Sequence, residues 1–170
     1  MLRWLILFVI VLVVAFLILR YWLIPAQSPT PPPLADRLAF IKDGGKLTQL
    51  AACGAKPNCV SSFAEGEAYI APLSYEDDQE KAKERLKATL AQMPRASLVF
   101  EAENYVHIVF RSRMMGFFDD AEGLFDDAEK KIYLRSAARL GYSDLDANRR
   151  YLEKLSQNFY QQTPNLDHLR

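Results

Sequence analysis

The chain has 170 residues, of which 50% are hydrophobic, and its 21 basic and 21 acidic residues give a formal net charge of zero. Beyond residue 24 it carries 19 basic and 21 acidic residues, which argues against a nucleic-acid-binding protein because such proteins need a basic excess. The apolar content of the same part argues against intrinsic disorder. About 145 residues remain after the first 24, which is enough for one domain of ordinary size.

Residues 4–24 form one unbroken apolar run in which Arg20 is the only charged residue. A helix of this length spans ~31 Å, which matches the ~30 Å apolar core of a bilayer. Trp4 and Trp22 stand near its ends, where amphipathic rings prefer the membrane interface. The run therefore predicts an uncleaved signal-anchor over residues 1–24, with the lipid bilayer as a partner through residues 4–24. A cleaved signal peptide is the alternative, although its apolar region is usually only ~7–15 residues long.

A Pro-rich linker is predicted over residues 25–46. Five of the nine residues in the segment 25–33, PAQSPTPPP, are Pro, which favours an extended polyproline spacer over packed structure. A pair of glycines interrupts the remainder of the linker. We therefore expect a folded domain over residues 47–162 and a tail over residues 163–170.

Cys53 and Cys59 are the only cysteines, and five residues separate them in the segment CGAKPNC. Gly, Pro and Asn favour a turn between them, so the segment can close a small disulfide loop. Two free buried thiols, or a metal or redox site, are the alternatives, although zinc and redox motifs use a two-residue spacing. A disulfide requires an oxidising compartment, which would place the domain outside the cytoplasm. The charges that flank the anchor are nearly balanced, so the cysteines decide the predicted orientation.

The first predicted element of the domain is a helix that Ser74 caps. Its apolar stripe consists of Ala82, Leu86, Leu90 and Met93. Alternating apolar and polar residues then predict strands over residues 97–101, 105–111, 117–125 and 131–137, with a candidate edge strand over residues 67–73. Connections this short make neighbouring strands antiparallel.

A final helix is predicted after the strands, with Ser143 and Asp146 as its capping pair. Its apolar stripe consists of Leu145, Leu152, Leu155 and Phe159. The order of elements predicts an α+β fold, in which an N-terminal transmembrane helix is followed by a small antiparallel sheet that packs helices on one face.

Four motifs occur in this order over roughly residues 47–160: CGAKPNCVSS, FFDDAE, IYLRSAARLGYSD and NRRYLEKL. Together they resemble the bacterial and plastid family catalogued as domain of unknown function 1499. The family pattern falls on Asn58 to Ser62, Phe118 to Asp120, Glu122, Arg135 to Arg139, Ser143, Asp144, Asn148 and Arg149. The chain departs from the pattern at Ala138 and Asp146, where the family usually has Ser and Gly. The resemblance implies no activity. With the anchor and the cysteines, it predicts a single-pass protein of the bacterial inner membrane whose C-terminal domain lies in the periplasm.

Asp119, Asp120 and Glu122 offer oxygen ligands of the kind that Ca²⁺ prefers. On a strand, however, Asp120 and Glu122 share one face and Asp119 points to the other, which splits the cluster. The structural alternative is that these carboxylates pair with Arg135 and Arg139 on the neighbouring strand, with Asp120 as the expected partner of Arg135. No resident metal is therefore predicted.

Arg135, Arg139 and Arg149 are candidates for an anion site, with Ser136 and the start of the last helix assisting. Asp144 and Asn148 complete this candidate network, either as ligand-binding or as structural residues. His107 is expected to be a half-exposed strand residue. The sequence has no Gly-x-Ser-x-Gly elbow, no HExxH pattern and no Gly-rich phosphate loop. No catalytic residue and no cofactor is therefore predicted.

These observations favour a membrane-anchored extracytoplasmic binding or interaction module whose ligand the sequence does not identify. The alternative is a metal-dependent or anion-binding accessory enzyme that uses the Asp119, Asp120 and Glu122 group together with the Arg135, Arg139 and Arg149 group. A protein partner in the cell envelope is a third interpretation, and no nucleic-acid partner is expected.

Overall fold

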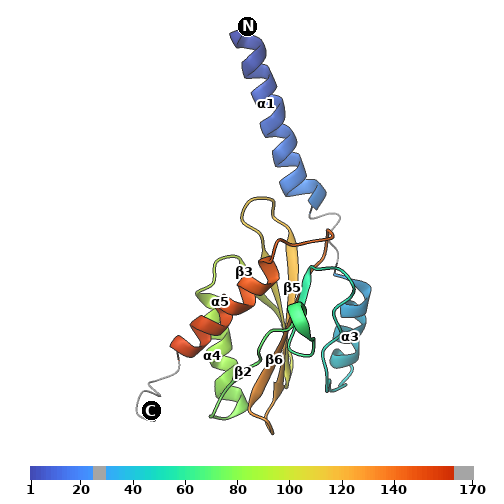
Figure 1. The fold of residues 1–170 in the computed structure, drawn as a ribbon, viewed down its shortest axis with the longest axis vertical. Helices are drawn as coiled ribbons and strands as arrows, with labels where there is room; N and C mark the ends of the chain where they lie inside the picture. Colours follow the sequence, from blue (N-terminus) through green and yellow to red (C-terminus); the bar gives the residue numbers. More distant parts are fainter. Residues whose placement is uncertain (25–29, 163–170) are drawn as a thin grey trace.

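The computed structural model describes residues 1–24 and 30–162. Helix α1 (Leu2–Ile18) projects away from the domain (Figure 1). It continues through a π-helical segment, η1 (Leu19–Leu23), whose Arg20 contacts Met114 of the domain. Together these elements form a 22-residue helix with a mean hydropathy of 3.1 and no buried side chain, long and apolar enough to cross a membrane. The first five residues of the predicted linker, 25–29, and the predicted tail, 163–170, lie outside the described residues.

A six-stranded antiparallel sheet forms the centre of the domain. Its strands are ordered β1 (Cys59–Ser61), β6 (Lys131–Ala138), β5 (Phe118–Asp126), β4 (Tyr105–Arg111) and β3 (Ala96–Glu101), and β2 (Leu73–Ser74) also pairs with β6. The four strands from β3 to β6 lie within one residue of the predicted boundaries. The candidate edge strand is shorter than expected, because Gly66–Ala68 form a 3-10 helix, η2. Its remaining pairing with the sheet consists of β2 and an isolated bridge between Tyr69 and Ser61.

Helices α4 (Gln79–Ala91) and α5 (Ala147–Gln161) cover one face of the sheet (Figure 1). Their predicted apolar stripes are buried against Val106, Ile108 and Phe110 of β4, which point to the same face. Leu145 is the exception and is 80% exposed, because it precedes α5 in a left-handed backbone conformation. The α+β fold predicted from the sequence is therefore confirmed.

Both helix caps lie elsewhere than predicted. Ser74 pairs with Lys131 in the sheet, so the carboxylate of Asp78 caps α4 instead and accepts a hydrogen bond from the backbone N–H of Lys81 at 2.8 Å. At the start of α5 the carboxylate of Asp144 accepts a hydrogen bond from the backbone N–H of Asn148 at 2.8 Å. The predicted pair of Ser143 and Asp146 makes no such bond to the first turn among the described contacts, because Asp146 occupies a left-handed conformation with φ of 61°.

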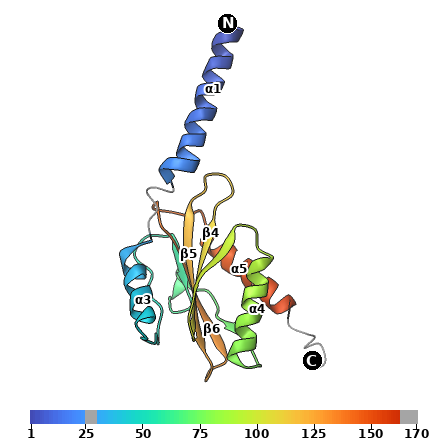
Figure 2. The same cartoon turned by 180° about the vertical axis from the view of Figure 1, so that it is seen from behind.

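Helix α3 (Pro32–Lys42) replaces most of the described part of the predicted linker. Proline is tolerated in the first turn of a helix, where the backbone N–H has no partner to lose. Leu34 and Ile41 are buried, and Ile41 packs with Tyr105 and Leu124 of the sheet. Figures 1 and 2 show α3 on the opposite side of the sheet from α4 and α5, so helices lie on both faces rather than one.

Candidate functional site

Glu122 in the middle of β5 is fully buried on the face of the sheet that α3 covers. Arg37 of α3 donates to both carboxylate oxygens of Glu122, at 2.9 Å to Oε1 and 2.8 Å to Oε2. Arg135 lies directly opposite in β6 and donates to Oε2 at 3.0 Å. The hydroxyl of Tyr105 donates to Oε1 at 2.8 Å, and burial together with the charge of Glu122 raises the pKa of this phenol. One carboxylate therefore joins the distant helix α3 to the two strands that flank β5.

Asp120 forms a second buried group on the same face. Arg139 donates to its two oxygens at 2.8 and 2.7 Å, and Nε2 of His107 lies 2.8 Å from Oδ1. Burial raises the pKa of Asp120, but the hydrogen bonds from His107 and Arg139 outweigh this effect and hold the pKa below its usual value. His107 is only 3% exposed, so the expectation of a half-exposed histidine is wrong. A sheet with helices on one face only would leave His107 exposed, whereas α3 and the segment that follows it cover this second face.

The pairing of carboxylates with arginines differs in one respect from the expectation. Arg135 contacts Glu122 rather than Asp120, because the strand register places Glu122 opposite Arg135 and Asp120 opposite Ala137. Asp120 is instead paired with Arg139, the residue that directly follows β6.

Asp119 lies on the other face of β5, away from Asp120 and Glu122, as the alternation of side chains in a strand requires. It is 3% exposed, and burial, the charge of Asp144 and the charge of Asp120 together raise its pKa to about 7. The three carboxylates therefore do not converge. No group of three or more His, Cys, Asp or Glu side chains able to hold a metal ion occurs within residues 1–24 and 30–162.

Ser136 and Asn148 also lie on the α5 side of the sheet, where both are fully buried. Ser136 is hydrogen-bonded to Oδ1 of Asn148, whose Nδ2 donates to Asp144 at 2.6 Å and to the carbonyl oxygen of Asn58 at 3.1 Å. Arg149 donates to the backbone carbonyl oxygens of Glu67 and Tyr69. These hydrogen bonds hold the start of α5 against β6 and against the segment 58–69, which contains β1. They form a network separate from Arg135 and Arg139.

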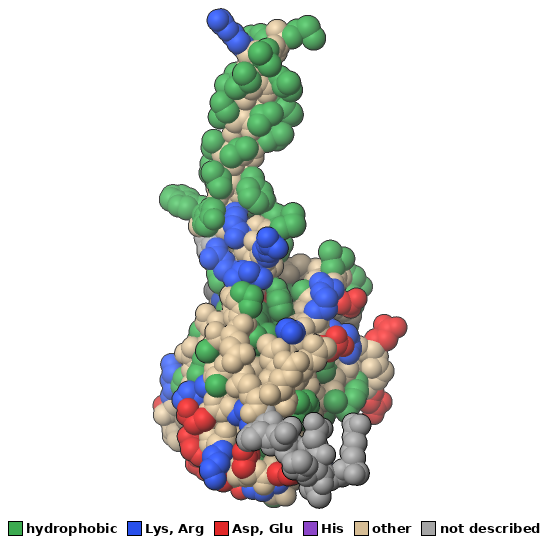
Figure 3. Space-filling view, turned by 90° about the vertical axis from the view of Figure 1, so that its left-hand side faces the viewer, with side chains coloured by type: hydrophobic (Ala, Val, Ile, Leu, Met, Phe, Trp, Pro, Cys, Tyr) green, Lys and Arg blue, Asp and Glu red, His purple; other side chains and the backbone are tan. Residues whose placement is uncertain are grey.

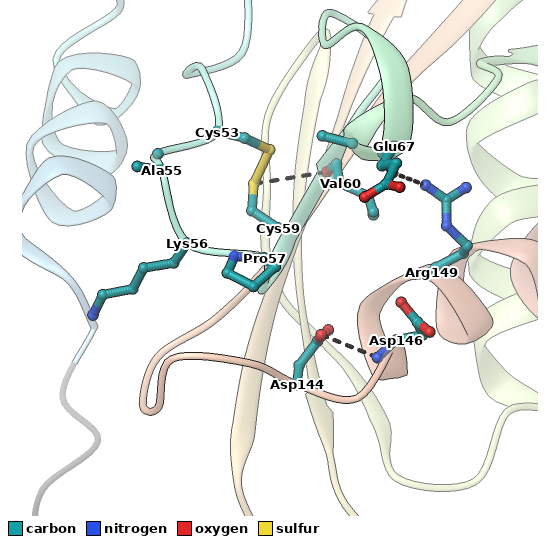
Figure 4. A pocket seen from close by; sticks show the side chains of 12 residues that line it. Cys53, Ala55, Lys56, Pro57, Cys59, Val60, Glu67, Asp144, Asp146 and Arg149 are labelled. Atoms are coloured by element: carbon teal, nitrogen blue, oxygen red, sulfur yellow. Dashed lines mark hydrogen bonds between the residues drawn. A yellow bond between two sulfur atoms is a disulfide. The ribbon is translucent and has the colours of Figure 1, made fainter.

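Cys53 and Cys59 form a disulfide with a Cα–Cα distance of 5.6 Å. The loop that it closes, residues 53–59, separates two cavities. The smaller, about 260 Å³, lies between the loop and the start of α5 and is lined by Glu67, Asp144, Asp146, Arg149 and loop residues (Figure 4). Figure 4 shows the side chain of Lys56 extending from the loop toward α3, away from Asp144 and Arg149.

The larger cavity, about 330 Å³, lies between α3 and β6 and is called here the α3–β6 cavity. Its charged lining residues are Arg37, Lys56, Arg135, Arg139 and Asp120. Small residues provide the space between them: Ala51, Ala52, Gly54, Ala137, Ala138 and Gly141. Nε of Arg135 is buried and has no hydrogen-bond partner. Glu122 lies behind the lining and binds Arg135. The site therefore contains four cationic side chains and two carboxylates, and its formal charge is +2 when His107 is counted as neutral.

This arrangement favours an anion over a metal ion. The oxygens of Asp120 and Glu122 already accept hydrogen bonds from arginine, tyrosine and histidine donors, and a metal ion would compete with these cationic groups for the same lone pairs. The guanidinium group of Arg135 is held in place by Glu122, and its Nε donor has no hydrogen-bond partner. Positioned donors of this kind, with an excess of positive charge, are the usual features of an anion-binding site.

Four members of this site are not among the candidate site residues predicted from the sequence: Arg37, Lys56, Tyr105 and His107. Arg37 is separated from Glu122 by 85 residues, and no local pattern reports such a contact. The one available signal was the helical spacing of Leu34, Leu38 and Ile41, which predicts that residues 32–42 pack against the domain rather than extend from it.

Comparison with known proteins identifies a family. A family model described as "Protein of unknown function (DUF1499)" matches residues 49–159, which include β1 to β6, α4 and nearly all of α5. The resemblance noted in the sequence is thereby confirmed. No curated protein matches the chain, and no solved structure matches it.

Proposed function

We propose that this chain, which belongs to the DUF1499 family of proteins of unknown function, is a membrane-anchored module that binds a small anionic ligand in the α3–β6 cavity. The proposal places the domain outside the cytoplasm, in the periplasm of a bacterial cell whose inner membrane holds the anchor. It assigns no enzyme activity.

The charge of the α3–β6 cavity carries the proposal. Four cationic side chains line it, and the carboxylates of Asp120 and of Glu122 behind the wall balance only two of them. Small residues leave about 330 Å³ of space between the cations. Ligand sites in proteins usually measure ~300–1,000 Å³, so this cavity suits a small ligand such as phosphate, sulfate or a short carboxylate. Lys56 is the one exposed side chain among these four cations, and none of the described contacts ties it to a buried carboxylate.

Two further observations support the cellular location. The helix formed by α1 and η1 has the length and hydropathy of a membrane span and buries none of its side chains against the domain. The Cys53–Cys59 disulfide is of the kind that persists in oxidising compartments. An anchored domain on the oxidising side of a membrane agrees with both.

A metal-dependent accessory enzyme, the alternative from the sequence, gains no support from the geometry. Asp119 lies on the opposite face of the sheet from the other two carboxylates, and Asp120 and Glu122 bind cationic donors. The anion-binding part of that alternative survives in the present proposal.

Thermal unfolding of the full chain in detergent tests the ligand proposal. Phosphate and sulfate at constant ionic strength should raise the Tm of the protein, since a ligand that binds only the folded state stabilises it by mass action. Ca²⁺, Mg²⁺ and Zn²⁺ as chloride salts should leave the Tm unchanged.

Lys56→Ala should reduce the anion-dependent increase in Tm without lowering the Tm in chloride, because Lys56 is exposed. The matched control is Lys154→Ala, which removes an exposed lysine of α5 that lies outside the lining of the cavity. An equal response of the two variants, or no response of the wild type to either anion, would refute the ligand proposal.

A further inference from the structure

The loop between β4 and β5, residues 112–117, lies against the end of the apolar helix. Arg20 in η1 donates a hydrogen bond to the backbone carbonyl oxygen of Met114. A Cβ atom placed on Gly116 would lie 3.2 Å from Nη2 of Arg111 and 3.5 Å from Nη1 of Arg20, so both guanidinium groups reach this loop. Figure 1 shows the β4–β5 loop rising beside the lower end of the helix.

The side chains of this region combine positive charge with exposed apolar surface. Met114 is 74% exposed and Phe117 is 38% exposed. Arg113 is also exposed, and the segment from Arg111 to Phe118, RSRMMGFF, contains no acidic residue. Figure 3 shows Lys and Arg side chains gathered where the helix meets the domain. Basic residues beside exposed apolar side chains are typical of protein segments that lie in the membrane interface.

We infer that the β4–β5 loop is a second contact with the bilayer, which binds the headgroups of acidic phospholipids. Arg20, Arg111 and Arg113 lie close enough to the end of the span to bind lipid phosphates. Met114 and Phe117 insert their side chains among the headgroups. The inference rests on the proposed anchor, because that anchor places the loop at the membrane surface.

The position of the loop favours a bilayer over a protein partner. The apolar helix ends at Leu23, three residues after Arg20, so a loop that contacts Arg20 lies at the depth where the apolar core gives way to headgroups. The opposite end of β5 leads into the β5–β6 turn, which is roughly 26 Å away for nine extended residues. That turn, residues 126–131, carries three acidic residues and two lysines, and Lys130 and Lys131 are paired with Asp127 and Glu129. The excess of basic residues therefore lies at the end of β5 beside the apolar helix and not at the remote end.

Fluorescence of the full chain in vesicles tests this inference. A cysteine introduced by Met114→Cys is labelled with an environment-sensitive dye, NBD, while the native disulfide stays oxidised. The chain is reconstituted in vesicles of phosphatidylcholine alone or with one quarter phosphatidylglycerol, with and without lipids that carry a spin label near the headgroup. The matched control is Ala128→Cys, an exposed position in the β5–β6 turn at the other end of β5.

The dye at residue 114 should show blue-shifted emission and at least twofold quenching by the spin-labelled lipid, and phosphatidylglycerol should strengthen both effects. The dye at residue 128 should show neither. Adding Arg113→Glu to the residue 114 variant should remove the effect of phosphatidylglycerol. Equal emission and quenching at the two positions, in protein that floats with the vesicles, would overturn the lipid contact while leaving the anchor intact. Protein that does not float with the vesicles would overturn the anchor itself, and the inference with it.

Discussion

Arg37 in α3 and Glu122 in β5 form a bidentate ion pair across 85 residues of sequence, with Nη2 of Arg37 2.8 Å from Oε2 of Glu122. The pair ties the segment that follows the anchor to the middle strand of the sheet. It also places a guanidinium group in the wall of the α3–β6 cavity. The position of the anchor-proximal helix and the shape of the proposed ligand site therefore depend on the same contact.

Arg37→Ala should destabilise the domain by about 2 kcal/mol. Removal of one partner of a buried ion pair typically costs ~3–5 kcal/mol, and the loss is reduced here because Arg135 and Tyr105 still donate to Glu122. The midpoint of urea unfolding measures the effect. Asp36→Ala is the control, since Asp36 is exposed on the same helix. If the two variants unfold at the same urea concentration, α3 is not held by this pair.

Asp119→Asn should make the domain more stable at pH 8 and leave its stability at pH 4 unchanged. The folded protein raises the pKa of Asp119 from 3.8 to about 7, so between these values the folded state keeps a proton that the unfolded state has lost. The wild type therefore loses stability from this group as the pH rises from about 4 to about 7. The loss above pH 7 is at most roughly 4 kcal/mol.

Differential scanning calorimetry between pH 4 and pH 8 measures this difference. Asp43→Asn, at an exposed acidic position, serves as the control because it should leave the pH profile of the Tm unchanged. If the Tm of Asp119→Asn varies with pH in parallel with that of the wild type, the folded state does not raise the pKa of Asp119.

Replacing both Cys53 and Cys59 by Ser should lower the free energy of unfolding by about 2 kcal/mol, the chain-entropy value for a short closed loop. Dithiothreitol should lower the stability of the wild type by a similar amount and should not affect the double variant. The change should also weaken phosphate binding, because Gly54 and Lys56 of the loop line the α3–β6 cavity. Wild-type protein purified without reductant whose thiols both react with maleimide would contradict the disulfide.

Treating intact cells with a membrane-impermeant protease tests the orientation. Once the outer membrane is made permeable, a domain in the periplasm should be digested while the amino terminus of the chain, before α1, stays protected. A cytosolic protein serves as the control for the integrity of the inner membrane. Survival of the domain under conditions that digest a periplasmic marker would place it in the cytoplasm.

Local patterns were sufficient to predict the elements that bury one face against the α4 and α5 side of the sheet. The apolar stripes of these helices and the alternation in β3 to β6 are short-range signals, and the structure bears them out. Caps were less predictable because several adjacent acids and serines compete for the same backbone donors. Asp78 and Asp144 are the acids that accept hydrogen bonds from the first turns of α4 and α5, and their positions depend on where β2 and β6 end.

The second face of the sheet could not be predicted in the same way. Proline-rich composition pointed to an extended spacer, and the packing of Ile41 against Tyr105 and Leu124 outweighed it. An extended linker in place of α3 would leave His107 half exposed and would keep Arg37 away from the site. The pairing of arginines with carboxylates was also unpredictable, because it depends on the strand register. The register places Arg135 opposite Glu122 and Ala137 opposite Asp120.

Isothermal titration calorimetry of the full chain in detergent with inorganic phosphate tests the central claim most directly. The account predicts binding at one site per chain, at least tenfold weaker binding in Lys56→Glu, and unchanged binding in Lys154→Glu. Wild-type protein that releases no heat with phosphate or sulfate, or a Lys56→Glu variant that binds as tightly as the wild type, would contradict the claim that the α3–β6 cavity is an anion-binding site.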